Sequence, residues 1–170
     1  MDNNFNPTFY KNQIFRGLTE NEIDQIKPFF RPVDFSAGQR IIEENSTGDT
    51  MYLLLEGQVY VDKTLVPLFE DMEIRAEDKK IVEVNADQLL YFGEMSLFNE
   101  NQKRSASIIS KTAIKTAAVK KSDFETIIRE NPVVGNIILK NVILKLANLL
   151  DNANVEISKL ITAFTIALRS

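Results

Sequence analysis

Short apolar runs separated by glycine-containing turns constrain the fold of this chain more than any other feature. Between Phe35 and Val61, the pairs Ala37-Gly38, Gly48-Asp49 and Glu56-Gly57 separate the apolar runs. Runs of this length and spacing are typical of strands in an all-β barrel or sandwich. We therefore expect a mainly β fold with flanking helices, a jelly-roll-like β-roll (double-stranded β-helix). Its strand junctions would use glycines with positive φ, namely Gly38, Gly48, Gly57 and Gly93.

Helical signals lie on both sides of these strands. Thr19 with Glu22 forms a capping-box pattern for a short helix that Pro28 would end. Ser122 with Glu125 forms the same pattern for a second helix. No proline follows Pro132, so we expect one long C-terminal helix from there. The expected units are residues 1–130, the β-roll with an N-terminal helical segment, and residues 131–170, the helix.

The expected C-terminal helix carries a heptad pattern. A second apolar stripe, Ile138, Val142 and Leu149, can pack on the β-roll, while the heptad positions contact a partner helix; packing of their first half on the β-roll is the alternative. At about 1.5 Å per residue the helix spans about 60 Å, more than a domain of this size covers. The heptad positions are Leu139, Ile143, Leu146, Leu150, Ala153, Ile157, Leu160, Phe164 and Ala167.

The run FGEMSLFNENQKRSAS, Phe92 to Ser107, brings together residues suited to an anion. Gly93 lets the backbone approach, and a helical turn starting at Glu94 would point unpaired N–H groups at a phosphate. The Glu94 carboxylate suits a ribose hydroxyl, and the Arg104 guanidinium suits phosphodiester oxygens. An ordinary turn with a surface ion pair is the alternative. Strand-like alternation from Ser105 to Ile109 favours the anion site, because it places Arg104 at the start of a strand facing the turn.

This run resembles the phosphate-binding cassette of the cyclic-nucleotide-binding domain family, especially the catabolite activator type. The resemblance extends over Ile14–Ile26, Phe35–Val61 and Lys111–Pro132. It implies a ligand, cAMP or alternatively cGMP, and a long helix that acts as lid and forms a parallel homodimer. It also implies that ribose and phosphate are held by Gly93, Glu94, Met95, Ser96, Arg104, Ser105 and Ala106.

The chain departs from the family pattern in two turns. Asn45 stands where the family usually has glycine, and asparagine tolerates the left-handed region better than most residues. The segment Lys63 to Gln88 is longer than a tight hairpin needs. We expect an extended β-hairpin with Pro67 at an edge or bulge. It is either a surface insertion or an element that binds a partner.

A third departure concerns the base. Leu149 and Leu150 occupy the positions where a catabolite activator offers hydroxyl residues to adenine, so base recognition stays open. Nearby polar residues either contact the base or flank the heptad positions: Asn148, Asp151 and Asn152.

Composition argues against other functions. The 170 residues are 44% hydrophobic and include neither histidine nor cysteine, so the commonest general base, nucleophile and zinc ligands are missing. Glu43 and Glu44 would point to opposite faces of a strand, so we expect a solvated strand end rather than a pair of catalytic carboxylates. We therefore expect no enzyme, metal or cofactor.

Charge and hydropathy point to a cytoplasmic protein that binds neither nucleic acid nor membrane. The net charge of −4 does not favour binding to a polyanion. Transcription factors of the family carry a helix-turn-helix after the long helix, whereas the sequence here ends with that helix. We interpret the lysines at 111, 115, 120 and 121 as a solvated face. No run of eighteen apolar residues and no secretory leader is found, and the lack of cysteine fits a reducing compartment.

The leading hypothesis is a cyclic-nucleotide-binding regulatory module that signals through movement of its C-terminal helix. The alternative is a scaffold that keeps the β-roll, binds no nucleotide and dimerises through that helix. A fragment of a larger regulator is a third reading.

Overall fold

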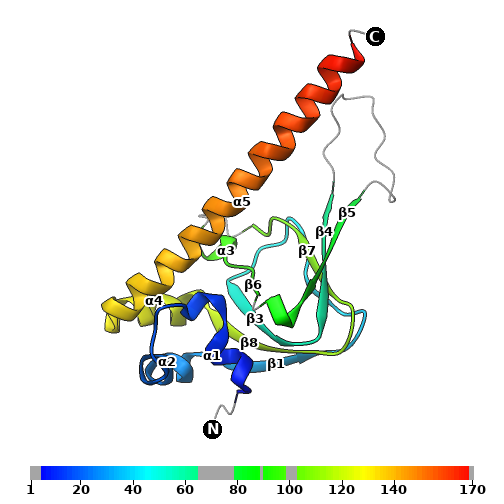
Figure 1. The fold of residues 1–170 in the computed structure, drawn as a ribbon. Coiled ribbons are helices and arrows are strands. Elements are labelled where there is room, and N and C mark those ends of the chain that lie inside the picture. The colour runs from blue at the N-terminus through cyan, green and yellow to red at the C-terminus, as the bar shows by residue number, and fades with distance from the viewer. Residues whose placement is uncertain (1–4, 65–78, 89, 99–102, 169–170) are drawn as a thin grey trace.

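The computed structural model describes residues 5–64, 79–88, 90–98 and 103–168. Figure 1 shows short N-terminal helices, a β-roll, and a long helix that runs past the roll. In chain order the elements are α1 Pro7–Lys11, η1 Gln13–Phe15, α2 Glu20–Ile26, η2 Lys27–Phe29, β1 Arg31–Phe35, β2 Arg40–Ile42, β3 Thr50–Glu56, β4 Gln58–Thr64, β5 Lys79–Asn85, η3 Ala86–Gln88, β6 Tyr91–Phe92, α3 Met95–Phe98, β7 Ser107–Ser110, β8 Ile114–Lys120, α4 Lys121–Glu130 and α5 Pro132–Ala167.

The strands within the described residues form two four-stranded antiparallel sheets. One has the order β1-β8-β3-β6 and the other β2-β7-β4-β5. The mainly β fold with a long C-terminal helix is thus confirmed. Strands β4 and β5 pair antiparallel from Gln58↔Asn85 to Thr64↔Lys79, so the described part of the expected hairpin is its base, with a first strand that begins at Gln58 rather than at Lys63. Residues 65–78, which include Pro67, lie outside the described residues.

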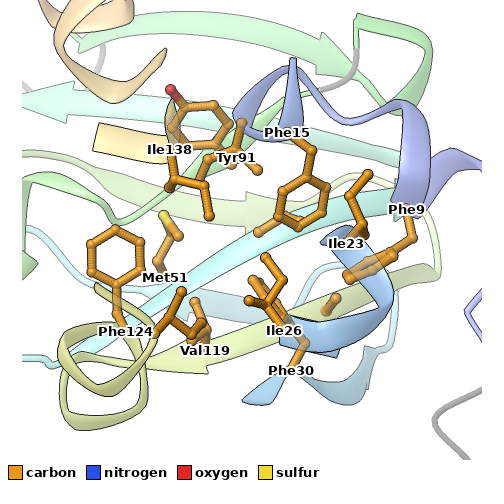
Figure 2. Close-up of a cluster of buried hydrophobic side chains, with 14 of the residues drawn as sticks. Phe9, Phe15, Ile23, Ile26, Phe30, Met51, Tyr91, Val119, Phe124 and Ile138 are labelled. Atoms are coloured by element: carbon orange, nitrogen blue, oxygen red, sulfur yellow. The ribbon is translucent and has the colours of Figure 1, made fainter. Parts of the chain in front are cut away.

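A large apolar core joins the N-terminal helices to the β-roll and to α5 (Figure 2). Phe9 contacts Phe15 and Phe30 edge to face, with ring centroids 5.1 and 5.3 Å away. Ile138 of α5 lies in the same core and is 1% exposed. The core therefore includes residues from both of the units expected from the sequence.

The N-terminal helical segment is more divided than expected. The stretch Ile14 to Ile26 contains η1 and the separate helix α2, and α1 precedes both. The capping box of Thr19 and Glu22 is confirmed, with the Thr19 N–H donating to the Glu22 carboxylate at 2.8 Å. Hydrogen bonds from Thr19 hold the pKa of the Glu22 carboxyl below its usual value.

The predicted capping box of Ser122 and Glu125 is wrong. Helix α4 begins at Lys121, and its N-cap, Lys120, makes no side-chain cap. Strand β8 runs directly into the helix, and the Lys121 N–H donates instead to the Asp49 carbonyl at 2.7 Å. A main-chain acceptor from the turn before β3 takes the place of a local cap.

Among the described residues, helix α5 packs against the core through its first half. Its buried residues are Val134, Gly135, Ile138 and Val142, and every residue from Ala147 to Leu168 is exposed. The Asn141 amide donates to the carbonyls of Ile14 at 2.9 Å and Arg16 at 2.8 Å, which ties α5 to the N-terminal segment. Thus the residues that bury α5 and the amide that ties it to the N-terminal segment all lie in the first half of the helix.

By length and composition alone, α5 is apolar enough to cross a membrane, with a mean hydropathy of 1.6 in its most apolar window. From the sequence we expected no membrane span because no unbroken run of eighteen apolar residues occurs. Polar residues interrupt α5 throughout, but they do not lower its mean hydropathy enough to exclude it by this second criterion. One such helix is weak evidence for a membrane span, since a helix that packs in a core can pass the same test. The first half of α5 does pack in the core.

Candidate functional site

The structure brings all seven predicted site residues to one cavity of about 330 Å³, between the β-roll and α5. This volume falls within the range of about 300–1,000 Å³ usual for small-molecule sites. The described lining residues are Ile42, Val61, Leu90, Tyr91, Phe92, Gly93, Glu94, Met95, Ser96, Arg104, Ser105, Ala106, Ile108, Lys145 and Leu149.

Arg104 is buried at the centre of the polar part, with 7% of its surface exposed. Its Nη1 donates to the Gly93 carbonyl at 3.0 Å and to Ser96 Oγ at 2.8 Å, and its Nη2 donates to the Thr50 carbonyl at 2.8 Å. Burial lowers the pKa of the guanidinium, but arginine begins so high that it stays charged. A fixed positive charge therefore lies at the cavity wall.

Two glycines make room for this guanidinium. A Cβ on Gly93, which has φ +85°, would lie 2.6 Å from Arg104 Nη1, and one on Gly48 would lie 2.5 Å from Nη2. The prediction of positive φ holds at Gly38, Gly57 and Gly93 but is wrong for Gly48. Gly48 is needed for space against a side chain distant in sequence, which no local turn pattern reveals.

A turn next to the cavity fixes the main chain of Arg104. Its N–H donates to the Ser46 carbonyl and its carbonyl accepts from the Asn45 N–H, both at 2.9 Å. Asn45 has φ 64°, so the expected left-handed residue is confirmed. The asparagine turn thereby contributes to the position of the arginine.

The short helix α3 and the turn just before it supply two of the groups that accept hydrogen bonds from Arg104, Ser96 Oγ and the Gly93 carbonyl. The Leu97 N–H donates to the Glu94 carbonyl at 3.0 Å, and Ser96 Oγ donates to the Gly93 carbonyl at 2.9 Å. Ser105 is exposed, and its hydroxyl donates to Met95 Sδ at 3.3 Å. First-turn N–H groups have no partner within their own helix, so those of Met95 and Ser96 suit an anion.

Glu94, which is 4% exposed, forms an ion pair with Lys145 of α5 at 2.8 Å. Lys145 Nζ also donates to the Tyr91 carbonyl at 2.5 Å and lies 4.0 Å from the Tyr91 ring centroid. Burial lowers the pKa of Lys145, and the Glu94 charge opposes that shift. Burial, and then the Glu94 charge, raise the pKa of Tyr91.

Sequence reasoning missed Lys145. One signal was available, because Lys145 lies four residues before Leu149 and therefore on the same helical face. Leu149 does line the cavity, whereas Leu150 does not. The three polar candidates for base contacts are likewise outside the lining and exposed: Asn148, Asp151 and Asn152. Among the described residues, no group of three or more His, Cys, Asp or Glu could hold a metal ion.

Comparison with known proteins decides the family. The family model described as "Cyclic nucleotide-binding domain" matches residues 32–131, from β1 to the end of α4. The chain belongs to the cyclic nucleotide-binding domain family. This match includes the whole predicted cassette, Gly93 to Ala106.

Several relatives share this domain. The cyclic AMP receptor protein of Thermus thermophilus is 26% identical over 147 residues, which cover 86% of this chain and 61% of the relative. The cAMP-activated global transcriptional regulator CRP of Salmonella typhimurium is 30% identical over 92 residues, 54% of this chain and 39% of the regulator. The crystal structure of Thermus thermophilus catabolite activator protein has a TM-score of 0.71 at 24% identity, over 88% of this chain and 63% of that one. The chain thus spans less than two thirds of these proteins.

Proposed function

We propose that this chain is a regulatory module that binds a cyclic nucleotide, in the first place cAMP, and signals through the position of α5. The observation that carries the proposal is one cavity lined both by the seven cassette residues and by Lys145 and Leu149 of α5. A ligand in that cavity would contact the β-roll and the helix together.

The phosphate would bind at Arg104. Guanidinium carries five N–H donors, and the hydrogen bonds to Gly93, Ser96 and Thr50 take two from Nη1 and one from Nη2. The remaining Nη2 and Nε donors can meet equatorial phosphate oxygens as charge-assisted bonds. The Ser105 hydroxyl and the N–H groups of Met95 and Ser96 would add to them.

The ribose would bind at Glu94, whose carboxylate already accepts from Lys145. A ribose hydroxyl placed there competes with or joins the ion pair that links the cassette to α5. A ligand shifts a conformational equilibrium only by its different affinity for the two states. The Glu94–Lys145 pair supplies such a difference, because its geometry depends on where α5 lies.

The second half of α5 would form a parallel homodimer. Its heptad positions are exposed, among them Ile157 at 53%, Leu160 at 70% and Phe164 at 63%. Apolar residues repeated at this spacing are buried when two such helices pair. The module would act in the cytoplasm, without enzymatic activity and without contacting DNA through these residues.

Calorimetric titration with cAMP and cGMP, after removal of any co-purified nucleotide, tests the proposal. One charge-assisted hydrogen bond is worth about 1.5–3 kcal/mol, so Glu94→Gln should weaken binding by about ten- to a hundredfold. Arg104→Lys should weaken it further, because lysine cannot make paired bonds. Arg129→Lys, at an exposed arginine of α4, is the matched control and should bind like the wild type.

Arg104 also joins three main-chain segments, so its substitution can destabilise the fold. Thermal unfolding of each variant therefore shows whether binding is lost without loss of folding. Absence of binding by folded, nucleotide-free wild type would overturn the proposal. It would favour the scaffold alternative, which is also supported by the ion pair of Glu94 with Lys145 and by the hydrogen bond from Arg104 to the Gly93 carbonyl, because both site residues already have partners within the chain.

A further inference from the structure

The cavity has chemically different parts. Its described charged and hydroxyl groups gather around the Glu94–Lys145 ion pair and Arg104; they are Glu94, Ser96, Arg104, Ser105 and Lys145. The rest of the described lining is mainly apolar. Tyr91 also lines the cavity, but its hydroxyl donates to the Asn141 carbonyl at 3.3 Å.

One sheet forms a continuous apolar wall. Ile108 of β7 pairs with Ile42 of β2 on one side and with Val61 of β4 on the other, and all three line the cavity. Leu90, just before β6, adds to this lining. These side chains offer no hydrogen bond to a ligand.

Helix α5 contributes one further apolar residue to the lining. Leu149 lies four residues after Lys145, so the helix presents a charge and then an apolar side chain along one face. Leu149 is 49% exposed, which places it at the mouth of the cavity. A planar group between Leu149 and the sheet would keep one edge in water.

The geometry points to a site that selects the cyclic ribose phosphate and accepts different bases with little discrimination, an inference that rests on the proposed function. In this site Leu149 covers the base. Adenine and guanine differ only in hydrogen-bonding groups at their edges. An apolar pocket rejects such analogues poorly, whereas strong rejection needs polar groups that the analogue leaves unpaired. The ligand class is therefore cyclic nucleotides in general.

The test compares affinities for cAMP, cGMP, cCMP, cUMP and ribose cyclic phosphate without a base. We expect cAMP and cGMP to bind within about tenfold of each other, and the pyrimidine nucleotides within about a hundredfold of them. The compound without a base should bind more weakly but measurably. A preference for one base above about a thousandfold would overturn the inference while leaving the proposed function intact.

A variant pair locates the base contact. Leu149→Ala should weaken all four nucleotides by a similar factor, about tenfold, and leave the compound without a base unchanged. Leu144→Ala, at an exposed leucine of α5 outside the lining, is the control and should change nothing. An equal loss for the compound without a base would contradict the role of Leu149. If no cyclic phosphate binds at all, the proposed function falls, and this inference with it.

Discussion

The two halves of α5 share one sequence pattern but have different surroundings. In the first half, the heptad residues Leu139 and Leu146 pack against the core of their own chain, beside the buried Ile138. In the second half, Ile157 and Leu160 carry the same pattern and are exposed. A heptad repeat thus predicts an apolar contact without saying which surface supplies it.

The anchored half is most sensitive to loss of volume. Ile138 is 1% exposed, so Ile138→Ala leaves a cavity and should lower the free energy of unfolding by about 2–5 kcal/mol in urea denaturation. Val133→Ala, on the same half but 68% exposed, should change it by about 0.5 kcal/mol or less. Equal effects would mean that the first half is not anchored as described.

The second half of α5, whose heptad residues are exposed, should respond in association rather than in folding. Leu160→Ala removes one apolar side chain from each protomer, about 1.5 kcal/mol apiece, and should weaken a dimer by about a hundredfold in sedimentation equilibrium. Lys159→Ala, outside the heptad positions, is the control. A wild type that stays monomeric at high concentration would refute the dimer.

Lys145 lies near the boundary between the two halves of α5. The pH dependence of stability should show that its amine is buried against the β-roll. Burial sets its folded pKa below the ordinary value of 10.5, so the unfolded chain binds this proton more tightly. Over the interval just below pH 10.5, this group's contribution to stability should therefore rise with pH, by at most about 1.4 kcal/mol per pH unit. Unfolding free energies measured across that interval give the slope.

Two substitutions at Lys145 isolate this slope. Lys145→Met and Lys145→Arg should both remove it, because neither side chain titrates there. Comparison with wild type subtracts the contributions of other groups. A slope that survives both substitutions would show that it comes from another residue.

Gly135→Ala should give the smallest change in stability, and its sign should be opposite to the one that helix propensity alone predicts. Alanine favours an isolated helix over glycine by about 1 kcal/mol. Here the new Cβ would lie 2.7 Å from Ile128 Cα of α4, and overpacking costs about 1–3 kcal/mol. We expect a net loss of about 1 kcal/mol, measured by thermal unfolding, whereas Asn136→Ala, at an exposed neighbour, should show no loss.

The sequence predicted what depends on neighbouring residues. Strand runs, the capping box at Thr19 and the continuous helix α5 follow local rules, and the cassette is one contiguous stretch from Gly93 to Ala106. All seven predicted site residues of this stretch therefore line the same cavity. The ligand roles of these residues stay predictions.

What the sequence did not predict depends on tertiary contacts. Lys145 meets Glu94 only because α5 folds back over the cassette, and Gly48 is required only because Arg104 reaches it. Helix α4 starts at Lys121 because Asp49 accepts its N–H. In each case the partner lies far away in the chain, and no local pattern contains it.

The core also determines how this domain can be transplanted. A segment trimmed to the matched residues 32–131 would retain the cassette but discard Phe9, Phe15 and Ile138, all within the apolar core. Their neighbours in the β-roll would then face water. A fluorescent biosensor made from this module must therefore include everything from Phe5 to Leu149, the last residue of α5 that lines the cavity, and its reporter belongs on the exposed part of α5 beyond Leu149.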